Sequence, residues 1–152
     1  MPDLAIKVSI SEQKVFIMQS KEISWQADVS TSKFGLGFAE GSLMTPTGKF
    51  LIDEKIGEGE PLYTQFKGRK PIDVWNPAKG KSDDDKILTR ILWLTGIDEQ
   101  NANTKERYIY FHGTNQENLI GQPASHGCIR LRNHDMLELF QRTPIGTEVE
   151  IG

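Results

Sequence analysis

The chain has 152 residues and a formal net charge of −3, with 37% apolar and 26% charged residues. These values fit one globular domain over residues 1–152 and exclude disordered and fibrous proteins. The single cysteine excludes an intramolecular disulfide framework, apolar runs of at most four residues exclude a membrane helix, and the mildly acidic balance indicates no nucleic-acid partner.

Residues 4–29 predict three strands joined by short polar turns. Apolar residues alternate with polar ones over residues 4–10 and 23–29, and an apolar run covers residues 15–18. A period of two is typical of a strand with one buried face, and short polar turns join neighbouring antiparallel strands. We therefore expect an antiparallel meander here.

Two irregular regions follow, separated by a short strand at residues 49–52. In residues 30–48, Gly35-Leu36-Gly37 is interpreted as a surface loop, because no lysine and helix of a phosphate-binding loop follow it. Residues 54–86 are polar and rich in glycine and proline, and are interpreted as a functional loop or lid. The run Asp83-Asp84-Asp85 is interpreted as a solvated turn, since no calcium-loop pattern surrounds it.

The last third of the chain predicts central strands at residues 87–94 and 107–111. Asn133 is the expected N-cap of the one helix, which has an apolar face and ends before Thr143-Pro144. A final strand is expected at residues 148–151. The fold class is therefore mostly β: a β-sandwich or a partly open barrel of mixed sheets, with one short helix after the cysteine loop.

The chemistry-bearing residues gather around the single cysteine, Cys128. It could be a buried structural cysteine, because a free cysteine behaves as a small hydrophobe. It could also join His112, His126 and His134 in a metal site, although the paired spacings typical of zinc ligands are missing. The third interpretation is a nucleophile.

A nucleophilic Cys128 explains its neighbours best. A histidine within hydrogen-bond reach can take the thiol proton and form a thiolate–imidazolium pair that attacks a carbonyl. The bend at Gly127 would present consecutive backbone N–H groups to an oxyanion, and Arg130 would favour the thiolate if the fold brings it close.

The block His112-Gly113-Thr114, followed after eleven residues by His126-Gly127-Cys128-Ile129-Arg130, resembles the L,D-transpeptidase catalytic domain, or YkuD domain. The spacer Ile120-Gly121-x-Pro123-x-Ser125 and the segment Thr45-Pro46-Thr47-Gly48-Lys49-Phe50 also fit the family pattern. The resemblance covers nearly the whole chain but is weak between residues 54 and 103.

The resemblance also implies roles for individual residues. In that family the motif cysteine is the nucleophile and the upstream histidine is the general base, which points to Cys128 and His112, with the carbonyl of Gly113 orienting the base. The other implied roles are an oxyanion hole, formed by His126, Gly127 and Cys128, and substrate binding, by Arg130 and Ser125.

The reaction implied by the resemblance is acyl transfer on peptidoglycan stem tetrapeptides or muropeptides through a Cys128 thioester. An amine of a second stem gives a 3→3 cross-link, water gives an L,D-carboxypeptidase, and a free D-amino acid gives exchange; the sequence leaves these acceptors open. No cofactor and no metal are expected, and the protein is expected to be a monomer. The non-enzymatic alternative is a wall-binding or metal-binding module.

The sequence gives two opposing expectations for the compartment. The family substrate implies the periplasm or cell envelope, whereas the start Met1-Pro2-Asp3-Leu4, which has no basic and apolar export signal, implies the cytoplasm.

Overall fold

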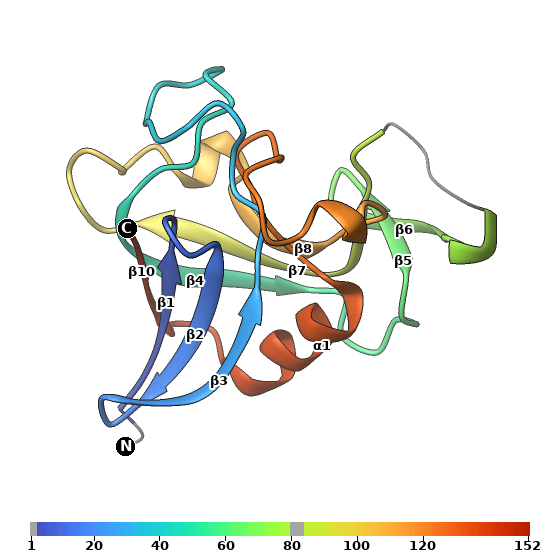
Figure 1. The fold of residues 1–152 in the computed structure, drawn as a ribbon, viewed down its shortest axis with the longest axis horizontal. Coiled ribbons are helices and arrows are strands. Elements are labelled where there is room, and N and C mark those ends of the chain that lie inside the picture. Colours follow the sequence, from blue (N-terminus) through green and yellow to red (C-terminus); the bar gives the residue numbers. More distant parts are fainter. Residues whose placement is uncertain (1–2, 80–83) are drawn as a thin grey trace.

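The computed structural model describes residues 3–79 and 84–152 and consists of one mixed sheet with a single α-helix (Figure 1). The strands follow the order β3-β2-β1-β10-β4-β7-β5-β6, and β8 pairs with β7 and β9. The strands are β1 (Leu4–Ser9), β2 (Lys14–Gln19), β3 (Glu22–Asp28), β4 (Gly48–Ile56), β5 (Thr64–Lys67), β6 (Lys70–Val74), β7 (Ile87–Gly96), β8 (Tyr110–Gly113), β9 (Ile129–Leu131) and β10 (Glu148–Ile151). The helix is α1 (Asn133–Arg142), and the short 3-10 turns are η1 (Pro77–Lys79), η2 (Lys105–Arg107) and η3 (Glu117–Leu119).

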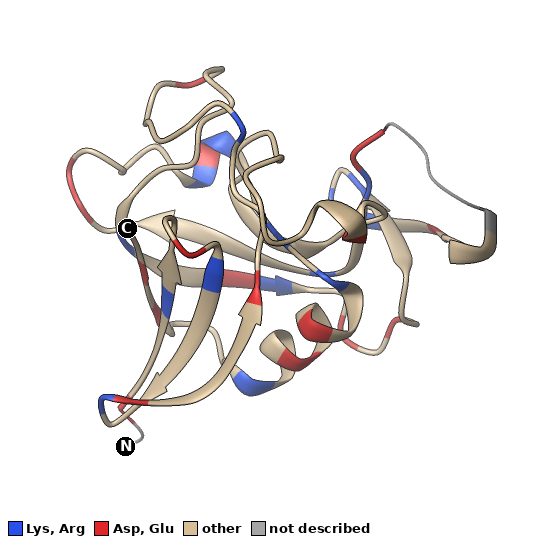
Figure 2. Cartoon of the chain, viewed as in Figure 1, with Lys and Arg blue, Asp and Glu red and all other residues tan. Residues whose placement is uncertain are grey.

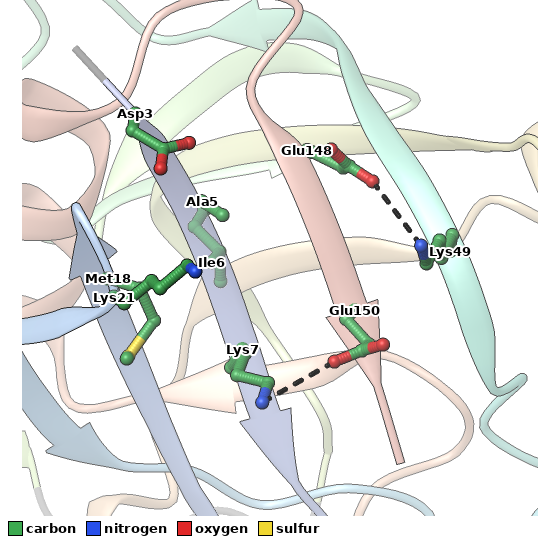
Figure 3. Close-up of a pocket in the computed structure, with 9 residues that line it drawn as sticks. All are labelled: Asp3, Ala5, Ile6, Lys7, Met18, Lys21, Lys49, Glu148 and Glu150. Atoms are coloured by element: carbon green, nitrogen blue, oxygen red, sulfur yellow. Dashed lines mark ion pairs between the residues drawn. The ribbon is translucent and has the colours of Figure 1, made fainter.

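The predicted meander and the mostly β fold with one helix after the cysteine are confirmed. β1 also pairs in parallel with β10, with Ile6 opposite Val149 on the buried face. The next pair in the register, Lys7 and Glu150, points to the opposite, exposed face, where the two side chains lie 3.6 Å apart (Figure 3). This face has a shallow depression of about 370 Å³, which is lined by exposed ion pairs. None of its lining residues belongs to the cysteine block, defined as residues 112–114 together with 126–130.

Helix α1 covers the face of the sheet formed by β7 and β8 (Figure 1). Met136, Leu139 and Phe140 are buried on one side of the helix and complete the main apolar core. Asn133 is the first residue of the helix rather than its N-cap, a position that Arg132 occupies. The expected N-cap was therefore one residue off, because a carboxylate distant in sequence, that of Glu117, accepts the Asn133 N–H at 2.7 Å.

The expected long loop at residues 54–86 contains a β-hairpin, β5–β6, and β5 pairs with β7. Phe66 on β5 is buried and anchors the hairpin to the sheet. All five residues of β6 are exposed, including Ile72 and Val74, so the strand buries no face against the core. Its proline, Pro71, is tolerated because β6 is an edge strand.

Acidic and basic residues are interspersed along the chain (Figure 2). Within the described residues, no helix is long and apolar enough to cross a membrane.

Candidate active site

Parallel pairing of β8 with β9 brings the two parts of the cysteine block together. The partners are Phe111 with Ile129 and His112 with Arg130, so Cys128 directly precedes β9 beside Tyr110. His112 is thus two residues along β8 from Tyr110, whose N–H contacts the Cys128 thiol. The sequence placed His112 and Cys128 in one site, but the strand β9 that aligns them was not predicted.

The thiol of Cys128 rests between the backbones of two tyrosines. Its Sγ accepts a hydrogen bond from the Tyr110 N–H at 3.4 Å and donates one to the Tyr108 carbonyl at 3.3 Å. The side chain is half-buried and packs against the apolar cluster of Phe66, Ile91 and Tyr110. This burial raises the pKa of Cys128 to about 12, so the resting group is a neutral thiol.

His112 is almost fully buried at 2% exposure. Its Nδ1 lies 2.6 Å from the carbonyl of Gly113, which can only accept, so Nδ1 carries the proton and Nε2 is the basic nitrogen. Burial lowers the pKa of His112, and the Asp85 carboxylate opposes this effect by favouring the charged ring. The raised pKa of Cys128 and the lowered pKa of His112 favour a protonated thiol and a neutral imidazole at rest, because both groups are desolvated.

The side chain of Asn133 holds the backbone next to Gly113 through hydrogen bonds. Its Nδ2 donates to the Thr114 carbonyl at 2.7 Å, and its Oδ1 accepts from the Thr89 hydroxyl at 2.7 Å. Thr89 lies in a bulge of β7 with a φ of 75°, a conformation that a β-branched residue rarely adopts. The buried network therefore fixes the carbonyl that orients His112. Sequence reasoning missed this function of Asn133, because it assigned the side chain to a helix cap.

Two hydroxyl groups fix the turn that carries the cysteine. Ser125 donates to the Cys128 carbonyl at 2.6 Å and accepts the Gly127 N–H at 3.3 Å, and Thr45 donates to the Gly127 carbonyl at 2.9 Å. Gly127 has a φ of +121°, which favours glycine. Ser125, expected to bind substrate, is fully buried with its hydroxyl used inside the turn.

Arg130, the other residue expected to bind substrate, is a fully buried cation. Its Nη1 donates to Asp85 at 2.9 Å and to Gln116 at 2.7 Å, while Nε and Nη2 are buried and have no hydrogen-bond partner among the described residues. Asp85 is thus a partner of the cysteine block, and the predicted solvated turn was wrong for this residue. Asp84 is exposed as predicted, and Asp83 lies outside the described residues.

His126, expected at the oxyanion, has a half-exposed side chain whose Nδ1 lies 3.5 Å from Asp85. The alternative metal site also included His134, which is exposed on α1, where its ring lies edge-on to Tyr63. In the part of the chain that the structure describes, no three His, Cys, Asp or Glu side chains are grouped to hold a metal ion.

The thiol faces a cleft of about 300 Å³. Arg107 forms one wall and is held by the carbonyls of Gly37 and Met44 at 3.2 and 2.6 Å. The remaining lining residues are Glu40, Gly41, Leu43, Glu106, Tyr108, Ile109, His126 and Cys128. The half-buried thiol of Cys128 is therefore accessible to a ligand from this cleft.

The tip of the β5–β6 hairpin contacts the tyrosines that hold the thiol. The guanidinium carbon of Arg69 lies 4.9 Å from the ring centre of Trp93 and 5.1 Å from that of Tyr108, and Nη1 donates to the Tyr110 hydroxyl at 3.3 Å. Stacking of a guanidinium on aromatic rings is favourable, so the hairpin braces this side of the site.

The raised pKa of Cys128 predicts slow alkylation. A pKa of about 12 leaves roughly a thousandfold less thiolate at neutral pH than an ordinary cysteine has. We expect iodoacetamide to label the native protein slowly, with a rate that keeps rising into alkaline pH, as measured by intact-protein mass spectrometry. The urea-unfolded chain is the control and should react like a free thiol. A rate plateau near neutral pH would instead show a preformed thiolate.

Comparison with known proteins shows the family to which the chain belongs. The family model described as the YkuD L,D-transpeptidase catalytic domain matches residues 3–151. YqjB of Bacillus subtilis, a relative that carries the L,D-transpeptidase name, is 37% identical over 112 residues, which cover 74% of this chain and 59% of YqjB. The chain thus spans little more than half the length of that relative.

Two solved structures have the same fold. An L,D-transpeptidase from Mycobacterium smegmatis matches with a TM-score of 0.64 and 14% identity, over 99% of this chain and 59% of that chain. L,D-transpeptidase 3 from Mycobacterium tuberculosis, in complex with a faropenem-derived adduct, matches with a TM-score of 0.62 and 15% identity, over 99% and 60%. Since the family model covers all but the outermost residues, this chain belongs to the YkuD family of L,D-transpeptidase catalytic domains.

Proposed function

We propose that this chain is a cysteine acyltransferase that acts on peptidoglycan stem tetrapeptides, an L,D-transpeptidase that forms 3→3 cross-links. The observation that carries the proposal is the parallel pairing of β8 with β9, which aligns His112 with Arg130 and places Cys128 just before β9 beside Tyr110, with the thiol at a cleft. Family membership supports the same reaction.

Acylation begins when Nε2 of His112 takes the proton of the Cys128 thiol as the sulfur attacks the carbonyl of the third stem residue. Because both groups are neutral at rest, the thiolate forms in the attack itself. The new C–S bond gives a tetrahedral intermediate. Its collapse breaks the peptide C–N bond, and the imidazolium returns the proton to the leaving D-alanine amine, so that a thioester remains.

The backbone N–H groups at His126, Gly127 and Cys128 are the proposed oxyanion donors. The Gly127 N–H is directed to Ser125 at 3.3 Å, a long hydrogen bond that an oxyanion, as a charged acceptor, can outcompete. Ser125 and Arg130 are fully buried, which supports a role in holding this turn and β9 rather than in touching the substrate.

The second half-reaction returns the thiol. An amine of a neighbouring stem attacks the thioester, His112 accepts the amine proton, and the departing thiolate takes that proton back. Water in place of the amine would give an L,D-carboxypeptidase, and a free D-amino acid would give exchange, by the same acyl-enzyme.

The direct test is acyl-enzyme formation by Cys128. With a tetrapeptide donor or a carbapenem, intact-protein mass spectrometry should show one covalent adduct on the wild-type chain and none on Cys128→Ala. An adduct on the variant at the wild-type rate contradicts the assignment of the nucleophile. Stoichiometric zinc in the purified protein, together with no adduct on the wild-type chain, would favour the metal-binding module.

A further inference from the structure

Asp85 contacts two residues that flank Cys128 in the sequence, His126 and Arg130. It precedes β7, yet its Oδ1 accepts from Arg130 on β9 at 2.9 Å and its Oδ2 lies 3.5 Å from Nδ1 of His126 in the cysteine turn. Among the ion pairs of residues 3–79 and 84–152, this is the one that includes a fully buried charge. One carboxylate therefore contacts side chains on both sides of Cys128.

The side chain of Asn115 holds the backbone on both sides of Asp85. Oδ1 of Asn115 accepts the Lys86 N–H at 2.9 Å, and Nδ2 of Asn115 donates to the Asp84 carbonyl at 2.9 Å. Both neighbours of Asp85 are thereby tied to the loop that follows β8. Asn115 itself is only 7% exposed, and both hydrogen bonds are partly buried.

The charges that act on His112 come from two elements. Arg130 on β9 disfavours a charged imidazole and so lowers the pKa of His112, and burial acts in the same direction. The Asp85 carboxylate raises the pKa of His112 and acts more strongly than Arg130 does, and the Gly113 carbonyl also favours the charged ring. Asp85 thus supplies negative charge that offsets both the Arg130 guanidinium and a protonated His112.

We propose that Asp85 is a positioning residue for the acyl transfer, whose carboxylate holds Arg130 and His126 and stabilises His112 as an imidazolium during attack by Cys128. The inference rests on the proposed function. When the thiol proton moves to Nε2, a cation forms beside the buried guanidinium of Arg130. Without a carboxylate, the two positive charges would repel each other in a poorly solvated site.

The test compares Asp85→Asn with Asp84→Asn, an exposed neighbour in the same loop. The rate of acylation by a carbapenem is measured as a function of pH. For Asp85→Asn we expect the maximal rate to fall about tenfold, a part of what general-base catalysis contributes. The acidic limb of the profile should move to lower pH, because removal of the carboxylate makes His112 harder to protonate. Asp84→Asn should keep the wild-type profile.

A second variant covers the case in which Asp85→Asn leaves Arg130 unpaired and does not fold. In Asp85→Asn/Arg130→Gln both charges of the pair are removed together, which proteins tolerate better than the loss of one. The acidic limb should still move to lower pH, since Asp85 has the stronger effect on His112. Asp85→Glu keeps the charge and should restore the wild-type limb.

The outcomes separate the two proposals. If the wild-type chain forms no acyl-enzyme, the proposed function fails. If the wild-type chain is acylated but the limb stays in place in a folded Asp85→Asn or in the double variant, only the role of Asp85 is overturned.

Discussion

Replacement of His112 by glutamine is expected to slow acylation of Cys128 by about 10²–10⁴-fold, the usual contribution of a general base. The reason is the thiol pKa of about 12: almost no thiolate exists at neutral pH, so the attack needs a group that takes the proton. Glutamine can keep the hydrogen bond to the Gly113 carbonyl but has no basic nitrogen. Stopped-flow acylation by a carbapenem measures the loss.

The pH profile separates loss of the base from loss of the fold. The wild-type rate should fall at acidic pH as His112 becomes protonated, whereas His112→Gln should have no such limb and should rise steadily toward alkaline pH. His134→Gln, a change at an exposed histidine, is the control and should behave like the wild type. An unchanged acidic limb in His112→Gln would remove His112 as the base.

The second large effect is expected for Gly113→Ala. A Cβ at this position would collide with the side-chain oxygen of Asn133 and lie 2.8 Å from the backbone carbonyl of Leu88, which cannot move away as a flexible side chain would. Overpacking and a disturbed buried hydrogen-bond network should together cost about 3 kcal/mol of unfolding free energy. For a chain of this size, the melting temperature should fall by roughly 6–12 °C.

Gly152→Ala is the matched control, because its Cβ would meet no atom within 4 Å. Its melting temperature should equal that of the wild type in differential scanning calorimetry. If Gly113→Ala were as stable as the control, the contact between Asn133 and the chain at Gly113 would not be the tight one described above. Acylation should also slow in this variant, because the carbonyl that orients His112 shifts.

The sequence predicted those parts of the fold that local patterns determine. The meander alternates with a period of two, and α1 has a continuous apolar face, so both follow from the order of residues alone. β9 has only three residues, and β6 is a short run that begins with Lys70-Pro71 and buries no face, so neither was distinguished from a loop. They form because neighbouring strands offer unpaired backbone groups.

The residues of the site also divide into those that the sequence could predict and those that it could not. Cys128, His112 and Gly127 could be selected because their side-chain chemistry and spacing are unusual. Asp85 and Asn133 could not, since an acidic run predicts a turn and an asparagine before an apolar stretch predicts a cap. Their partners, Arg130 and Thr114, are distant from them in sequence, and only the folded sheet brings them together.

The parallel pair β1–β10 has a consequence for the order in which the molecule assembles. Ala5 pairs with Glu148, and β10 in turn separates β1 from β4, so an inner strand of the sheet comes from the last part of the sequence. The meander and the β4–β7 pair can therefore form early as separate units, but they cannot join until β10 is available. Such long-range closure slows folding, and we expect refolding on the slow, millisecond-to-second side of the range for small domains.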